Sequence, residues 1–358
     1  MSKKNKFILV FGYVGFLAFL FEGSARLAFS IPKVAKRLQA NDEYTYRRNW
    51  VQEHQKYGME AYYAFDMYDP SKGWIPKPNL RDVKTFDNKT LNTNSKGLRG
   101  KVDFPYTKNK EKVRILILGD SFTFGDEVSD DETYSAHLQA MLPHTEIINM
   151  GVHGYGHDQM LILLKEEGIK YEPDIVILGF LPLDMPRNLL EFRDFAKPRF
   201  VLDRGELKLT GTPVPRPENI LQWDWAIPRI FDIFSLVHHR VKKLSGLQQK
   251  EMEDITTAIL TEMVRLIENI HAIPILVYLP RGKEIAMDIA VTQDEAYMSS
   301  ICQLNEKANC FSTRPYFAEK IAQGETFKSR GHWEPAGHRT VAEAIKRYLV
   351  DEGHVTVP

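Results

Sequence analysis

The chain has 358 residues, and 47 lysines and arginines balance 47 aspartates and glutamates, so its formal net charge is zero. A nucleic-acid-binding surface normally shows a basic excess, so this balance argues against a nucleic-acid partner. Hydrophobic residues make up 43% of the chain and charged residues 26%, with 22 glycines and 2 cysteines. This globular composition excludes disordered, collagen-like and disulfide-scaffold proteins. The length corresponds to roughly two domains, or to one enlarged α/β domain.

The N-terminus holds the one long apolar run of the sequence, residues 7–21, which follows three lysines within residues 3–6. A helix of this length spans about 22 Å, short of the ~30 Å hydrocarbon core of a bilayer. The run extends to Phe29 if Glu22 and Arg26, four residues apart, pair on one helix face. We therefore expect a single-pass membrane anchor with the lysines in the cytoplasm and the body outside.

Two other interpretations of this run remain open. The first is a cleaved signal peptide, with Gly23 and Ala25 as the small residues before the cut, which would release a secreted body. The second is a helix buried in the protein.

We expect the chain to divide into three parts. Residues 1–34 comprise the lysine-containing cytoplasmic tip and the membrane anchor or signal. Residues 35–110 are expected to form a stalk and an N-terminal extension that packs on the main domain. Residues 111–358 are expected to form the main domain, in which residues 185–247 interrupt the pattern as an insertion. Residues 199–202 and 206–209 of this insertion flank Asp203-Arg204-Gly205 and predict a hairpin.

Apolar runs alternate with helical patterns from residue 111 onward, which predicts a parallel sheet with helices on both faces. The expected strands are residues 114–119, 146–149, 174–180, 273–279 and, shorter, 310–315. The expected helices are residues 131–142, 158–167, 255–270, 295–308 and 339–349. Cys302 and Cys310 lie eight residues apart, and a disulfide and two unrelated thiols are equally compatible with that spacing.

A serine directly follows the first buried strand, in the segment Gly119-Asp120-Ser121. Ligands of an open parallel sheet bind beyond the carboxyl ends of its strands, so the Ser121 hydroxyl is placed to act as a nucleophile. A serine needs a base within hydrogen-bond reach, and a helix-capping serine is the alternative interpretation. The candidate base is His332, in a loop before the last helix where Trp333, Pro335 and Gly337 are crowded together.

These segments resemble the SGNH (GDSL-type) hydrolase superfamily, in its bacterial membrane-anchored form, from about residue 114 to the C-terminus. Gly119-Asp120-Ser121 is similar to the first family block, residues 149–156 to the second, and His332 with its neighbours to the last. The resemblance implies a flavodoxin-like three-layer α/β/α sandwich, with Ser121 as nucleophile and His332 as general base. It also implies that the backbone N–H groups of Ser121 and Gly154 form the oxyanion hole.

The sequence departs from the family at two functional positions. Leu183 stands where the third block usually has an asparagine for the oxyanion, and Asn188 or Arg187 are candidates to replace that donor. Ser329 and Arg330 stand where the last block usually has an aspartate before its histidine. An acid at that place normally fixes the tautomer of the base.

Glu334 and Asp184 are the candidates for the missing acid. Arg330, if it lies close to His332, would disfavour the imidazolium form of that base.

The resemblance implies a membrane-tethered ester hydrolase or acyl (acetyl) transferase that acts on an acylated glycan or another envelope ester. The alternative is a catalytically weak or inactive relative that binds glycan or serves as a scaffold. No cofactor is expected. His153 and His157 have the spacing of a helical metal pair, but Gly154 and Gly156 between them argue against a helix, so no metal site is expected either. The oligomeric state is left open.

Overall fold

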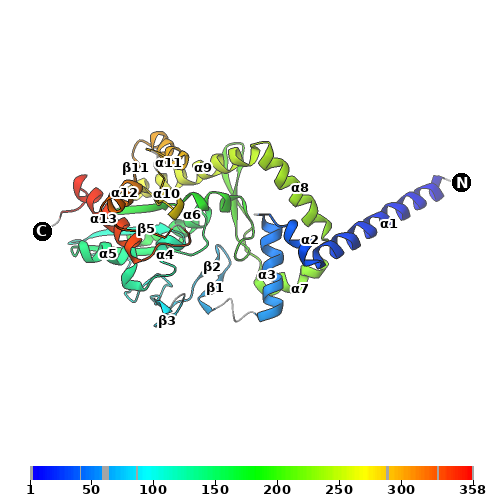
Figure 1. Ribbon diagram of the computed structural model, residues 1–358, viewed down its shortest axis with the longest axis horizontal. Coiled ribbons are helices and arrows are strands. Elements are labelled where there is room, and N and C mark those ends of the chain that lie inside the picture. The colour runs from blue at the N-terminus through cyan, green and yellow to red at the C-terminus, as the bar shows by residue number, and fades with distance from the viewer. Residues whose placement is uncertain are drawn as a thin grey trace. The chain divides into compact units, whose positions relative to one another are not determined.

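The computed structural model describes residues 3–40, 42–58, 64–85, 88–287, 290–328 and 330–356 (Figure 1). The chain forms two compact units. The first consists of Met1–Tyr62, Leu190–Ala196 and Pro215–Glu251, and the second of Tyr63–Leu189, Lys197–Val214 and Met252–Pro358.

A five-stranded parallel sheet forms the centre of the second unit, in the strand order β11-β10-β7-β5-β6. The strands are β5 (Val113–Gly119), β6 (Thr145–Gly151), β7 (Ile175–Phe180), β10 (Ile273–Tyr278) and β11 (Asn309–Ser312). If the five strands are numbered 1 to 5 in chain order and read from β6 to β11, this is the flavodoxin-like order 2-1-3-4-5. The strands β5, β7 and β10 are rich in isoleucine, valine and leucine, as expected of strands that are buried on both faces.

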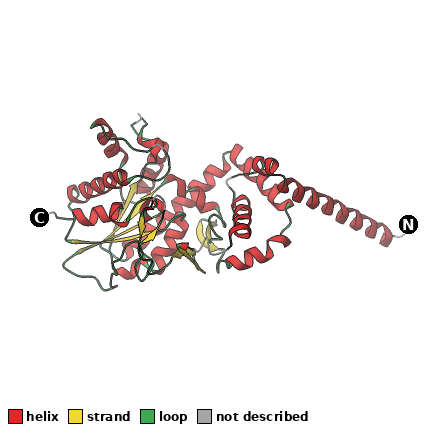
Figure 2. Cartoon of the chain, turned by 60° about the horizontal axis from the view of Figure 1, so that its bottom comes forward, coloured by secondary structure: helices red, strands yellow, loops and turns green. Residues whose placement is uncertain are grey.

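Helices cover the sheet on both sides (Figure 2). Helices α5 (Tyr134–Met141), α12 (Arg314–Ala322) and α13 (Pro335–Asp351) share a core with one set of alternate strand residues, among them Ile115, Ile177 and Val277. Helices α6 (His157–Glu166), α9 (Leu247–Asn269) and α11 (Gln293–Leu304) belong to the other side, where His157 stacks on Phe180. The predicted three-layer α/β/α architecture is confirmed.

Two small antiparallel ladders precede the sheet: β1 (Asp66–Asp69) with β2 (Gly73–Pro76), and β3 (Val83–Lys84) with β4 (Thr90–Leu91). Trp74 of β2 is buried, and its indole N–H donates to the carbonyl of His153 at 3.0 Å. Tyr155 Oη returns a bond to the carbonyl of Trp74. The segment before the sheet therefore holds the loop that follows β6.

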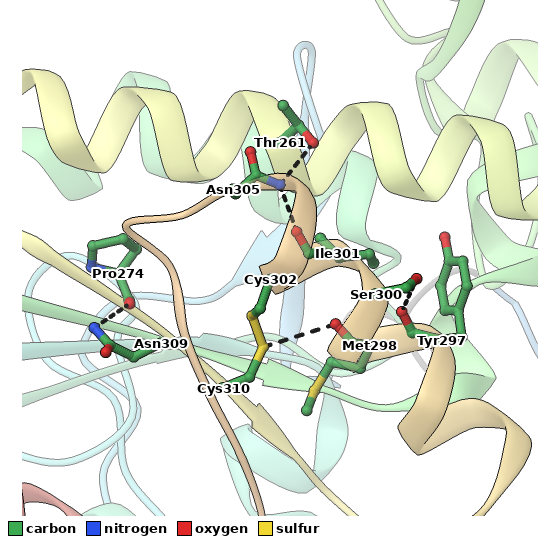
Figure 3. The surroundings of a disulfide bond; sticks show 10 residues. All are labelled: Thr261, Pro274, Tyr297, Met298, Ser300, Ile301, Cys302, Asn305, Asn309 and Cys310. Atoms are coloured by element: carbon green, nitrogen blue, oxygen red, sulfur yellow. Dashed lines mark hydrogen bonds between the residues drawn. A yellow bond between two sulfur atoms is a disulfide. The ribbon is translucent and has the colours of Figure 1, made fainter.

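The insertion contains the predicted hairpin, as β8 (Arg199–Asp203) pairs antiparallel with β9 (Glu206–Thr210). Near the end of the sheet, Cys302 of α11 and Cys310 of β11 form a disulfide (Figure 3). The sequence alone left open whether these cysteines are bridged or are two unrelated thiols, and the structure has the disulfide. The remaining short elements of the second unit are α4 (Ser121–Phe124), α10 (Gly282–Ile285) and the 3-10 turns Asp130–Glu132, Gly168–Tyr171, Pro182–Asp184 and Pro186–Leu189.

The first unit is helical. Its helices are α1 (Lys3–Ser30), α2 (Pro32–Arg37), α3 (Glu43–Tyr57), α7 (Pro217–Trp223) and α8 (Ile230–Leu244), with a 3-10 turn at Asp224–Ala226. Trp50 of α3 forms the centre of its core and meets the rings of Phe192 and Phe195 edge-on. Asp42 caps α3 by accepting the N–H of Thr45 at 2.7 Å.

Several predicted helices have different bounds in the structure: α9 begins at Leu247 rather than at residue 255, α11 ends at Leu304 rather than at residue 308, and α13 begins at Pro335 rather than at residue 339. The helix expected from residue 131 begins at Tyr134, because Ser129 and Glu132 close a capping-box turn first and Thr133 then caps α5. The helix expected to include Ile270 ends at Asn269, because His271 adopts a left-handed conformation with φ of 61°. The strands agree with the prediction to within a few residues, since buried apolar runs mark them directly.

Candidate active site

Ser121 lies at the start of the single turn α4, directly beyond the carboxyl end of β5. Asp120 caps this turn by accepting the N–H of Phe122 at 2.9 Å. The turn presses closely on β6: a Cβ at Gly151 would lie 2.3 Å from the backbone nitrogen of Phe124. Only glycine permits this approach, and it fixes the position of Ser121 at the mouth of the sheet.

The histidine loop is anchored by the residues that crowd around it. Trp333 is 4% exposed and donates from its indole to the carbonyl of Pro280 at 3.0 Å. Pro335 begins α13, and a Cβ at Gly337 would lie 2.7 Å from Trp333 Cβ. His338 is buried and accepts the N–H of Tyr134 at 3.2 Å. These four residues hold in place the loop that carries His332.

The structure brings the predicted nucleophile and base together. Ser121 Oγ lies 2.8 Å from His332 Nε2, a hydrogen-bond distance. The other ring nitrogen, Nδ1, lies 3.0 Å from Glu127 Oε1. If Nδ1 carries the proton and donates to the carboxylate, Nε2 is left free to accept from the hydroxyl. Ser121, His332 and Glu127 thus have the connectivity of a catalytic triad.

Neither acid proposed from the sequence contacts His332. Asp184 is bound by Arg187 Nη1 at 2.6 Å, and Glu334 lies 3.2 Å from Lys328 Nζ. Arg330 is exposed, whereas Ser329, the other substituted position, lies outside the described residues. The expectation that Asp184 or Glu334 would orient the base is therefore wrong, and Glu127 takes that position.

Glu127 reaches the histidine from the loop after α4, six residues beyond the nucleophile. Its φ is 67°, a left-handed conformation that few non-glycine residues adopt. Backbone conformations of this kind persist where the surrounding structure holds a side chain in a particular place. The signal in the sequence is the acidic pair Asp126-Glu127 directly after Gly125, close to the nucleophile, whereas the acids predicted from the sequence lie near the third and last family blocks.

Two backbone amides are candidates for an oxyanion hole. Within the described residues, the N–H groups of Ser121 and Gly154 donate to no protein acceptor. Gly154 has a φ of 76°, a backbone conformation that other residues adopt only with strain, and this conformation sets the direction of its N–H. The neighbouring residues fix its loop, since Trp74 binds the carbonyl of His153 and the ring of Tyr155.

The side chains considered as a replacement third donor are engaged elsewhere. Asn188 is fully buried and its amide nitrogen donates to Thr256 Oγ1 at 2.8 Å. Arg187 Nη1 lies 3.1 Å from Asp120 Oδ2 and also bonds the carbonyl of Tyr155. Arg187 therefore supports the carboxylate that caps the nucleophile turn, and Leu183, on the turn after β7, provides no donor.

A second carboxyl group lies beside the base. Asp126 Oδ2 is 3.9 Å from His332 Nε2, and Asp126 Oδ1 is 4.0 Å from His153 Nδ1. Burial raises the pKa of Asp126 above its usual value, and the two histidines act in the opposite direction. His153 also bonds Asp66 at 2.6 Å, whereas the ring of His157 is buried against Phe180. His153 and His157 therefore do not point toward a common metal position.

No family model matches the chain, and the search of curated proteins finds no match. Several solved structures are similar to it. A variant of an acetylxylan esterase from Geobacillus stearothermophilus is 17% identical over 67% of this chain and 95% of its own, with a TM-score of 0.40. A two-domain esterase active on acetylated mannans is 15% identical over 69% of this chain and 51% of its own, with a TM-score of 0.40.

A protein assigned to the lipolytic G-D-S-L family from Desulfitobacterium hafniense is 16% identical over 66% of this chain and 100% of its own, with a TM-score of 0.36. At these TM-scores the structures are similar to the chain in outline only. What the chain does has to be inferred from its own side chains.

Proposed function

We propose that the chain is an SGNH-type ester hydrolase with Ser121 as nucleophile, His332 as general base and Glu127 as the acid that orients the base. The observation that carries this proposal is the chain of contacts from Ser121 Oγ to His332 Nε2 at 2.8 Å and from Nδ1 to Glu127 at 3.0 Å. A serine with only a structural role needs no contact with a histidine that is itself bound to a carboxylate. Ser121 begins α4, Glu127 lies in the loop after α4 and His332 lies in the loop before α13, and the three side chains meet beyond the carboxyl end of β5.

The reaction would begin with attack of Ser121 Oγ on the carbonyl carbon of the ester while His332 Nε2 takes the hydroxyl proton. Negative charge then develops on the carbonyl oxygen, where the N–H groups of Ser121 and Gly154 would stabilise it. His332 returns the proton to the departing alcohol, leaving an acyl group on Ser121. The carboxylate of Glu127 stabilises the imidazolium formed in each step.

The second half of the reaction repeats these roles with a new nucleophile. A water molecule that gives its proton to His332 would release a carboxylic acid and complete hydrolysis. A sugar hydroxyl in the same place would complete an acyl transfer. Because the chain has no net charge and the site bears carboxyl groups, we infer an uncharged acyl ester rather than a phosphate ester as the substrate, with acylated envelope glycans as the leading class.

Membrane tethering forms part of the proposal. Among the residues that the structure describes, one helix, α1, is long and apolar enough to cross a bilayer. Its 28 residues correspond to about 42 Å of helix, and side chains of residues 7–21 are largely exposed. Its last turns, in contrast, pack within the first unit: Ala25 and Phe29 are buried. This packing favours a retained anchor over removal of the helix at Gly23 or Ala25, with the body on the extracytoplasmic side.

The contact of Glu127 with the base bears on the alternative of an inactive binding protein. That alternative rested on a missing acid and a missing oxyanion asparagine. In our proposal Glu127 serves as the acid, so only Leu183, at the position of the asparagine, still favours an inactive binding protein.

The test is hydrolysis of p-nitrophenyl acetate by the purified full chain. We expect turnover that Ser121→Ala and His332→Ala each reduce to the uncatalysed rate. Arg330→Ala, an exposed residue of the same loop, serves as the control and should leave turnover unchanged. Turnover that survives Ser121→Ala, or its absence from the folded native chain, would contradict the proposal.

A further inference from the structure

Helix α8 of the first unit exposes an apolar stripe. The stripe consists of Phe234, Val237, Val241 and Leu244, which are 63%, 53%, 58% and 89% exposed. Their spacing of three and four residues places them along one face of the helix. The helix buries Asp232 and Leu236 on another face. A surface helix normally turns its widest apolar face inward, so α8 is missing a partner for the stripe.

Helix α8 begins beside the C-terminal part of α1, within the same unit (Figure 1). The carboxylate of Glu22 accepts the N–H groups of Arg229 and Ile230 at 3.0 and 3.1 Å, which caps the start of α8. Arg26, which pairs with Glu22 at 2.6 Å, donates to the carbonyl of Trp225 at 2.9 Å. Glu22 is the first charged residue after the apolar run, so α8 starts at the level where that run ends.

The residues around α8 have the composition of a membrane–water interface. Trp223 and Trp225, in the segment before α8, are 57% and 70% exposed. Tryptophan is enriched at the interfaces of bilayers because its ring is apolar and its N–H is polar. The second half of α8 carries the exposed Arg240 beside the stripe, and its charge suits lipid phosphates. An apolar face beside basic side chains is typical of a helix that lies in the plane of the interface.

We propose that α8 lies in the interface of the bilayer that α1 crosses, with the stripe in the boundary between headgroups and acyl chains. The inference rests on the membrane anchoring of the proposed function. A bilayer suits the stripe better than a second copy of the chain does, because the helix that carries it starts where the apolar run of α1 ends and follows two exposed tryptophans. The chain is then held at the membrane by a spanning helix and a surface helix together.

The experiment uses the full chain reconstituted in vesicles of phosphatidylcholine and phosphatidylglycerol. The native cysteines form a disulfide, so a single introduced cysteine can carry an environment-sensitive nitrobenzoxadiazole label. Val237→Cys reports on the stripe. Lys243→Cys, exposed on the opposite side of the same helix by its spacing, is the matched control. Phe19→Cys, 76% exposed within the apolar run, reports on the anchor.

A nitroxide-labelled phosphatidylcholine should quench the label at position 237 at least about twofold more strongly than the label at 243. Equal quenching of the labels at 237 and 243 would overturn the proposal. A label at 237 whose emission is blue-shifted but not quenched by the lipid would also overturn it, because protein would then cover the stripe. The label at position 19 separates the two failures. If lipid quenches it while 237 behaves like 243, anchoring stands and only the inference about α8 is wrong. If lipid does not quench it, anchoring itself is wrong.

Discussion

Replacing Glu127 by glutamine tests the one catalytic role that the sequence did not indicate. The substitution keeps the size of the side chain but can place an amide donor where the carboxylate now accepts from His332 Nδ1. The neutral imidazole would then carry its proton on Nε2, which faces Ser121 Oγ at 2.8 Å. In that tautomer the ring cannot take the hydroxyl proton, so formation of the acyl-enzyme should slow while substrate binding is unaffected.

The size of the effect follows from the exposure of the acid. The comparable amide substitution at a buried aspartate in a serine protease triad lowers kcat about 10⁴-fold. The side chain of Glu127 is 30% exposed, so water can partly replace the carboxylate. We therefore expect kcat to fall about 10²- to 10³-fold, with KM changed by less than about threefold.

The assay is steady-state hydrolysis of p-nitrophenyl acetate between pH 5 and 9. Glu127→Asp retains the charge at a greater distance and should fall between the native chain and Glu127→Gln. Asp131→Asn removes an exposed carboxylate from the 3-10 turn that follows this loop and should leave kcat unchanged. If Glu127→Gln retains kcat within about twofold, or if Asp131→Asn lowers it equally, the carboxylate does not orient His332.

Three further predictions concern the oxyanion hole and the buried histidine. Gly154→Ala, at a φ of 76°, should displace one oxyanion donor and lower kcat about 10²-fold, and an unchanged kcat would remove that amide from the mechanism. Leu183→Asn should raise kcat about tenfold if the turn after β7 can direct an amide at the oxyanion, and equal or lower activity in the folded variant would show that it cannot. Burial lowers the pKa of His338 to about 3, against about 6.5 in an unfolded chain, so the unfolded chain binds the proton first. The free energy of unfolding should therefore fall as the pH drops from about 6.5 towards 3. His338→Gln should flatten this dependence in thermal denaturation, and an unchanged slope would mean that His338 does not contribute to it.

The order of the elements in the second unit could be predicted because its strands are buried on both faces. Runs such as residues 115–119 and 273–279 are apolar throughout, and the helices between them have a different period. The composition of residues 35–58 did not predict that they would belong with residues 215–251, because the aromatic contacts of Trp50 with Phe192 and Phe195 join segments far apart in the chain. Such pairings leave no periodic signal in either segment.

At the candidate site, Ser121 and His332 could be predicted because each lies in a distinctive segment of the sequence. The structure places them in contact, and their catalytic roles stay predictions. The acid could not be predicted from the family positions, because Glu127 reaches His332 through a left-handed backbone conformation that is visible only in three dimensions. The same holds for Asn188, whose amide is close in sequence to Leu183 but is bound to Thr256.

Covalent labelling with a fluorophosphonate, read by mass spectrometry of the digested full chain, tests the central claim most directly. An activated serine reacts with this probe and a structural serine does not. We predict a single adduct on the peptide that contains Ser121, lost in Ser121→Ala and reduced at least about tenfold in His332→Ala. An adduct on another serine, or no adduct on a folded native chain, would contradict the assignment of Ser121 as the nucleophile.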